Sequence, residues 1–146
     1  MVYRLTMALV SEGQEGNLGR DWKYEIEAKV FCSGLLSDVT VEVPTHTLES
    51  GSVISPYGSP EPVLLFEGEC ESELLLRLRL TATEVDVFIN DEGRVNKDIR
   101  LDLPVAGEEA SVQEIDLAAG VRESPGIRYR NAVFTLRIRL TLEHVA

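Results

Sequence analysis

The sequence predicts an all-β protein built as a sandwich of antiparallel strands. Two segments, residues 76–81 and 136–142, alternate strictly between aliphatic side chains and arginine or threonine. Successive side chains of a strand point to opposite faces, so each segment is expected to bury its aliphatic face and expose its arginines. Similar alternating runs recur at intervals of about a dozen residues, with loops rich in glycine and proline between them, as in sandwiches and barrels.

The first strand is expected over residues 2–10, where every second side chain is apolar, followed by a glycine-containing loop over residues 11–20. The clearest strand follows over residues 21–32, because lysine and glutamate fill its outward positions as in a sheet with one solvated face. Its expected inward side chains are Trp22, Tyr24, Ile26, Ala28 and Val30.

The middle of the chain contains shorter elements. A strand is expected over residues 39–43 and is expected to end at Pro44, since proline cannot donate a ladder hydrogen bond. Residues 51–62 contain three prolines and two glycines and are expected to form an irregular loop. Residues 63–66 are expected to begin a strand buried on both faces, and the first arginine strand follows over residues 74–82.

The alternation changes phase after residue 82. A bulge there is expected to turn Val85, Val87 and Ile89 inward. Residues 90–93, Asn-Asp-Glu-Gly, are expected to form a hairpin turn. A return strand is then expected over residues 95–103.

Residues 111–119 fit two structures. Ser111 and Glu114 have the spacing of a helix capping box, and Gly120 is suited to ending a two-turn helix. The alternation at Gln113, Ile115 and Leu117 fits a strand equally well. Both alternatives stay open, and the last strand is expected over residues 132–142.

These elements predict one domain, residues 1–146, with about eight strands and at most one short helix. The expected architecture is a Greek-key sandwich of the immunoglobulin-like or C2-like kind. A chain of 146 residues can bury a core without cross-links. Cys32 and Cys70 are accordingly expected to be reduced and inward-facing, rather than a disulfide or a catalytic thiol.

The outward arginines are expected to lie on the solvent side of the sheets, beside acidic rows such as Glu25 and Glu27. These arginines are Arg77, Arg79, Arg137 and Arg139.

Composition narrows the function. The formal net charge of −11 argues against nucleic-acid binding, which needs clustered cations. No apolar run approaches the length of a membrane-spanning helix, and the first residues do not resemble a signal peptide, so the expected location is cytoplasmic. Zinc-site spacings and phosphate- or dinucleotide-binding glycine patterns are absent, so no cofactor is expected.

One candidate metal site consists of acidic and amide side chains near the predicted hairpin, whose oxygen atoms suit Ca²⁺. The five residues are Asp86, Asn90, Asp91, Glu92 and Asp98. The same residue types are favoured in turns for backbone reasons, and the calcium-loop consensus is absent. The turn interpretation is therefore preferred, and calcium belongs to an alternative.

One candidate anion site consists of Arg122, Arg128 and Arg130, with Tyr129 between the last two. Guanidinium groups bind carboxylate or phosphate in bidentate fashion. The competing interpretation is a solvated loop that balances the charge of an acidic protein.

The preferred functional hypothesis is a non-catalytic module that binds another protein, or assembles with itself, through its end loops. It is preferred because the sequence shows no nucleophile with an orienting base. The alternative is a C2-like domain that binds calcium or another ligand through the acidic hairpin. The weakest alternative is an enzyme that uses Cys70 or His46.

Overall fold

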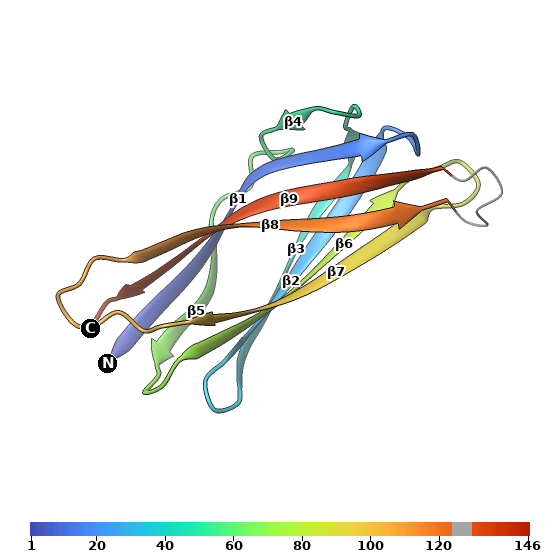
Figure 1. The fold of residues 1–146 in the computed structure, drawn as a ribbon. Coiled ribbons are helices and arrows are strands. Elements are labelled where there is room, and N and C mark those ends of the chain that lie inside the picture. The colour runs from blue at the N-terminus through green and yellow to red at the C-terminus, as the bar shows by residue number, and fades with distance from the viewer. Residues whose placement is uncertain (124–129) are drawn as a thin grey trace.

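The computed structural model describes residues 1–123 and 130–146, and every regular element in them is a β-strand (Figure 1). The strands are β1 (Val2–Gly16), β2 (Asp21–Phe31), β3 (Leu35–Thr47), β4 (Val53–Ile54), β5 (Val63–Glu69), β6 (Leu74–Glu84), β7 (Asp91–Leu101), β8 (Ser111–Arg122) and β9 (Asn131–His144). Among these residues no helix is long and apolar enough to cross a membrane. The ambiguous residues 111–119 belong to strand β8.

The strands form two antiparallel sheets that pack against each other (Figure 1). Sheet A has the order β4–β1–β9–β8, and sheet B has the order β3–β2–β6–β7. Strand β5 also pairs with β1, on the edge that β4 uses further along, because β9 occupies the other edge. Strands β1 and β9 are neighbours although they are distant in sequence, as are β2 and β6. The all-β sandwich prediction is confirmed, with nine strands in the described residues rather than about eight.

The core lies between the sheets and consists of the inward face of each strand. All five predicted inward side chains of β2 are buried, including Trp22, and so are the aliphatic side chains of the two arginine strands. The rings of Trp22 and Phe134 lie 5.7 Å apart between centroids and join β2 of sheet B to β9 of sheet A. Alternation therefore predicted the core face correctly in the long strands.

The edge strands β7 and β8 approach closely and close one side of the sandwich. A Cβ atom on Gly93 of β7 would lie 2.2 Å from the carbonyl oxygen of Gly120 in β8. Only glycine allows this approach of two backbones. Gly93 was expected in a turn, and its actual role is contact between the two sheets.

The turn predicted at residues 90–93 lies earlier in the chain. Strand β6 continues to Glu84, which pairs with Asp91 at the start of β7, so the connecting loop is residues 85–90. The prediction that Val87 and Ile89 point inward is wrong, because both are exposed at the tip of this loop. Residues outside a paired strand have no sheet to fix their alternation.

Strand β1 is longer than predicted because a bulge extends it. Its register with β9 shifts between Leu9 and Ser11, and pairing then continues to Gly16. The residues expected to form a polar loop are therefore largely part of sheet A. The bulge brings two polar side chains, Glu12 and Gln14, into the buried face.

Strand β3 passes through Pro44, which was expected to end it. Tyr24 pairs with Val43 and Trp22 pairs with His46, so Pro44 and the residue after it lie in a bulge on an edge strand. Proline is tolerated at such positions because no ladder hydrogen bond is lost there.

The prediction that β5 is buried on both faces is wrong. Leu65 is buried but its neighbour Leu64 is half exposed. The strand lies at the edge of sheet A, where one face of a short strand is open to solvent.

Cys32 and Cys70 form a disulfide, so the prediction that both are reduced is wrong. Cys32 follows β2 of sheet B and Cys70 follows β5 of sheet A, so the cross-link joins the two sheets. Alternation placed Cys70 correctly on a buried face. It could not show that two such residues on different strands are adjacent.

The arginines of the alternating strands are exposed, as predicted. The expected acidic row of β2 lies beside β6, where Glu27 is directly opposite Arg79 in register, but the ion pairs of these arginines are made with other strands. Arg77 contacts Asp98 of β7 at 3.1 Å, and Arg137 contacts Asp116 of β8 at 2.8 Å. The acidic row of β2 is not beside Arg137 and Arg139, because β9 lies in sheet A and β2 in sheet B. Strand order, which local patterning does not reveal, decides which acidic row lies beside each arginine.

Reducing the disulfide is expected to lower the free energy of unfolding by about 2–4 kcal/mol, because the unfolded chain regains the freedom of a closed loop. Urea unfolding with and without a dithiol measures the difference. The double variant Cys32→Ser/Cys70→Ser should match the reduced protein and be insensitive to the dithiol. An unchanged midpoint on reduction would contradict the expectation.

Arg137→Ala is expected to cost about 1 kcal/mol or less, because its ion pair with Asp116 is exposed. Ile138→Ala, one residue along, is expected to cost about 2–5 kcal/mol because Ile138 is fully buried. Urea unfolding of both variants gives the comparison. Equal costs would mean that the arginine face is itself covered, for example in an oligomer.

Candidate functional site

Loop 85–90 lies at the end of the sandwich opposite the chain termini (Figure 1). Its tip consists of Val87, Phe88 and Ile89, which are 87%, 93% and 50% exposed. Three consecutive large apolar side chains on one loop tip are unusual, because a folded chain normally buries residues of this kind. The sequence pattern did not reveal this feature, since the same residues fit an inward-facing strand.

The base of this loop is a buried pair of carboxyl groups. Glu84 and Asp91 are directly opposite in register and are 5% and 3% exposed. Burial, together with the nearby charges of Asp86 and Asp91 and a hydrogen bond with Asp91, raises the pKa of Glu84 to about 7, although the charge of Arg130 acts in the opposite direction. Glu84 therefore holds a proton over a range in which an ordinary glutamate is ionised. Sequence reasoning did not single out Glu84, because it was placed at a bulge and not in a paired strand.

The residues of the candidate calcium site are only partly brought together. Asp86 and Asn90 lie in loop 85–90, and Asp91 is the first residue of β7. Within the loop, the backbone N–H of Asp86 donates to Asn90 Oδ1 at 3.1 Å, which is the role expected of a turn residue.

The other two members of that set face outward along β7. Glu92 accepts a contact from Arg94 at 3.0 Å, and Asp98 is paired with Arg77 further down the strand. In residues 1–123 and 130–146, no three histidine, cysteine, aspartate or glutamate side chains are arranged to hold a metal ion.

The arginine set is divided between described and undescribed residues. Arg122 ends β8 and is exposed, and the guanidinium of Arg130 donates to the Glu123 carboxylate at 2.8 Å. Arg128 and Tyr129 lie outside the described residues. Binding of an external anion by the set therefore stays a prediction.

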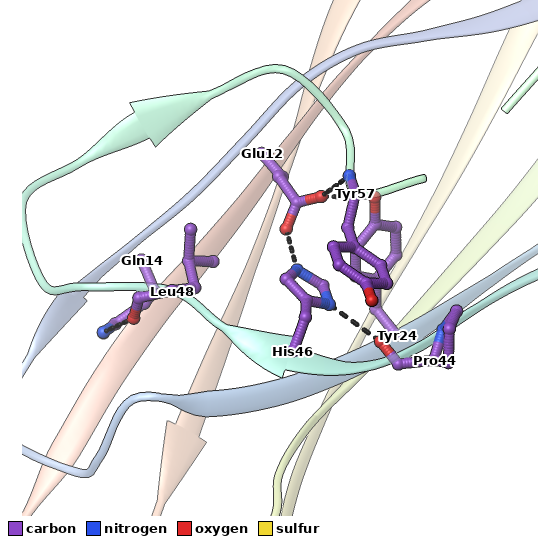
Figure 2. Close-up of polar contacts among 7 residues, drawn as sticks. All are labelled: Glu12, Gln14, Tyr24, Pro44, His46, Leu48 and Tyr57. Carbon is purple, nitrogen blue, oxygen red and sulfur yellow. Dashed lines mark hydrogen bonds and ion pairs between the residues drawn. The ribbon is translucent and has the colours of Figure 1, made fainter. Parts of the chain in front are cut away.

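A second group of polar side chains is buried between the sheets, on the side opposite β7 and β8. Figure 2 shows its main members, Glu12 of β1, Tyr24 of β2, His46 of β3 and Tyr57 of the segment after β4. Glu12 is fully buried, and His46 is 8% exposed. Sequence reasoning missed this group because Glu12 was expected in a loop and His46 was expected beyond the end of a strand at Pro44.

The Glu12 carboxylate has three partners (Figure 2). One oxygen accepts the backbone N–H of Tyr57 at 2.6 Å and the hydroxyl of Tyr24 at 3.2 Å, and the other contacts His46 Nε2. His46 Nδ1 contacts the carbonyl oxygen of Pro44 at 2.7 Å, and the ring of Tyr57 stacks flat on the imidazole at 4.5 Å between centroids. Burial, with the charge of Glu12, raises the pKa of Tyr24, so this hydroxyl stays protonated and donates.

This arrangement engages both nitrogens of His46. A backbone carbonyl only accepts hydrogen bonds, so Nδ1 carries a proton and donates it to Pro44, while Nε2 faces the Glu12 carboxyl group. Neither nitrogen is open to a substrate, which a general base requires. Cys70 has no free thiol, because it is in the disulfide. The group instead ties sheet A, sheet B and the segment after β4 together.

Gln14 is a further buried polar residue of β1, two positions after Glu12. Its side-chain amide donates to the carbonyl oxygens of Gly19 at 3.1 Å and Leu48 at 2.9 Å. These contacts fix the chain before β2 and after β3 to the same strand that carries Glu12. Gln14 therefore connects β1 to the segments before β2 and after β3.

No protein-family model matches the chain, and no curated protein or solved structure matches it. The comparison with immunoglobulin-like and C2-like sandwiches therefore stays a description of expected architecture, and function rests on the geometry of the chain itself.

Glu12→Ala is expected to lower the free energy of unfolding by about 3–5 kcal/mol, because it leaves the buried His46 without its partner. Glu15→Ala, an exposed carboxylate on the same strand, is expected to change it by less than about 0.5 kcal/mol. Urea unfolding followed by Trp22 fluorescence measures both. If the two variants cost the same, the buried contact does not stabilise the fold.

Proposed function

We propose that this protein is a non-catalytic binding module that contacts another protein through the tip of loop 85–90. The observation that carries the proposal is the exposure of Val87, Phe88 and Ile89, at 87%, 93% and 50%. Contiguous exposed apolar side chains mark interaction sites, and aromatic residues are enriched at the centre of interfaces. End loops of rigid sandwiches are where such sites are usually placed.

The surroundings of the tip support a protein partner. Asp86, Glu92, Arg94 and Arg122 are exposed and provide charges of both signs near the apolar residues. An apolar centre with a polar rim is the usual anatomy of an interface. The net charge of −11 makes a nucleic acid a poor partner.

The proposal of a non-catalytic role is supported by the state of the two residues that a catalytic alternative would use. His46 is enclosed by Glu12, Pro44 and Tyr57, and Cys70 is cross-linked. The disulfide also bears on location, since such cross-links persist in oxidising compartments and are rare in the cytosol. The disulfide therefore supports an oxidising compartment as an alternative proposal to the cytoplasmic location expected from the sequence.

Phe88→Ser is expected to weaken partner binding by about tenfold or more, because the ring is the largest side chain of the tip. Its free energy of unfolding should change by less than about 0.5 kcal/mol, since the side chain is 93% exposed. The measurement is quantitative capture of protein partners from the source cells, with sedimentation to detect self-association.

Val112→Ser is the matched control. Val112 is an exposed apolar residue near the start of β8, at the opposite end of the sandwich. It should retain the partners that Phe88→Ser loses. Equal capture by both variants would contradict the proposal, and capture that requires added Ca²⁺ and disappears with a chelator would favour the C2-like alternative.

A further inference from the structure

A groove of about 450 Å³ lies on the outer face of sheet B, beside the bulge of β3. This volume lies within the range of small-ligand sites. The groove crosses β2, β3, β6 and β7. Its lining includes Glu92 and Arg94, which also lie near the apolar tip, but no residue of loop 85–90 itself. The residues that matter for its chemistry are Lys23, Glu25, Glu42, Pro44, Thr81 and Thr83.

The floor of the groove consists of two threonines. Thr81 and Thr83 are each only 7% exposed although they point to the solvent side of the sheet, because longer side chains of β2 and β7 flank them. Neither hydroxyl makes a hydrogen bond to another residue of the described chain. Two sheltered hydroxyl groups therefore open into the groove with their bonding capacity unused.

Two carboxylates form one rim. Glu25 of β2 and Glu42 of β3 are directly opposite in register. Like charges at such positions repel and destabilise a sheet. Neither makes an ion pair within residues 1–123 and 130–146, in contrast to the arginines lower on the same sheet face, where Arg77 is paired with Asp98. The position between the two carboxylates is therefore suited to a positive charge from outside the chain.

The charged side chains that line the groove have one unneutralised negative charge. Arg94 is paired with Glu92 at 3.0 Å, so the charges of these two groups neutralise each other. The remaining charged groups of the lining are Lys23 with one positive charge and Glu25 and Glu42 with two negative charges, a sum of −1. A ligand with a single positive charge neutralises this sum.

The wall beside Glu42 is held from the inner side of the sheet. Pro44 lies in the bulge of β3, and its carbonyl oxygen accepts the hydrogen bond from His46 Nδ1 at 2.7 Å. Tyr24, whose backbone reaches the groove, is fixed by its hydroxyl contact with Glu12. The buried cluster of Figure 2 thus holds the β3 bulge, which forms this wall, in place. Bulges next to binding sites often orient residues in this way.

We infer that this groove is a second binding site, for a ligand that carries a primary ammonium group beside hydroxyl or amide groups. The ammonium lies between the carboxylates of Glu25 and Glu42, where charge-assisted hydrogen bonds are strong. The neighbouring polar groups of the ligand bond to Thr81 and Thr83. The ammonium can belong to a free amino sugar or to a lysine side chain of a peptide, and the two sources share this chemistry.

Titrations of the whole protein with three probes, followed by amide NMR shifts, test the inference. The probes are glucosamine, Nα-acetyl-lysine amide and, as a control without the charge, N-acetylglucosamine. At least one ammonium probe is expected to bind and to shift amides of β2, β3 and β6 around the groove. Binding of glucosamine alone assigns the sugar source, and binding of Nα-acetyl-lysine amide assigns the peptide source.

Three variants identify the groups involved. Glu42→Gln is expected to weaken binding by about tenfold, and Thr83→Val, which keeps the shape but removes the hydroxyl, is expected to weaken it less. Glu27→Gln is the matched control, because Glu27 is a carboxylate on β2 opposite Thr40, outside the groove lining. The melting curves of Thr83→Val and Glu27→Gln should match the parent protein, and that of Glu42→Gln should match it or lie slightly higher, because this variant removes the repulsion with Glu25.

The inference is overturned if neither ammonium probe binds, if N-acetylglucosamine binds as well as glucosamine, or if Glu42→Gln leaves the affinity unchanged. These outcomes do not depend on Phe88, because no residue of loop 85–90 lines the groove. The two proposals can therefore fail separately.

Discussion

The need to bury one face of each sheet against the other is the constraint on which the rest of this structure depends. Two stacked sheets exclude water from their inner faces, but their long sides remain open unless something closes them. On one side β7 and β8 meet at the glycine contact between Gly93 and Gly120. On the other side the Glu12–His46 contact and the disulfide connect the sheets. The polar and covalent contacts thus join the two sheets along the side that β7 and β8 do not close.

Alternation predicted what is local in this fold. The inward face of β2 and of both arginine strands follows from a period of two, and so does the solvent position of Arg77 and Arg137. Strand order, the partners of those arginines and the disulfide depend on contacts between distant segments. Bulges were a further source of error, because a single extra residue in β1 or β3 changes which side chains face inward.

The candidate sites were less predictable than the fold for the same reason. Loop 85–90 was expected to continue a strand, because valine, phenylalanine and isoleucine have high strand propensity wherever they occur. Glu12 and His46 lie 34 residues apart, on strands of different sheets, so local patterning does not bring them together. Glu25 was assigned correctly to an outward face, whereas Glu42 was not singled out. Only the strand register shows that the two residues are opposite one another.

The apolar tip of loop 85–90 is separated from the residues that determine folding. Its base is fixed by the buried pair of Glu84 and Asp91, whereas the tip itself contacts little of the chain. The sequence of the tip can therefore change with little effect on the stability of the scaffold. The same separation makes this loop a natural insertion point for engineered recognition sequences.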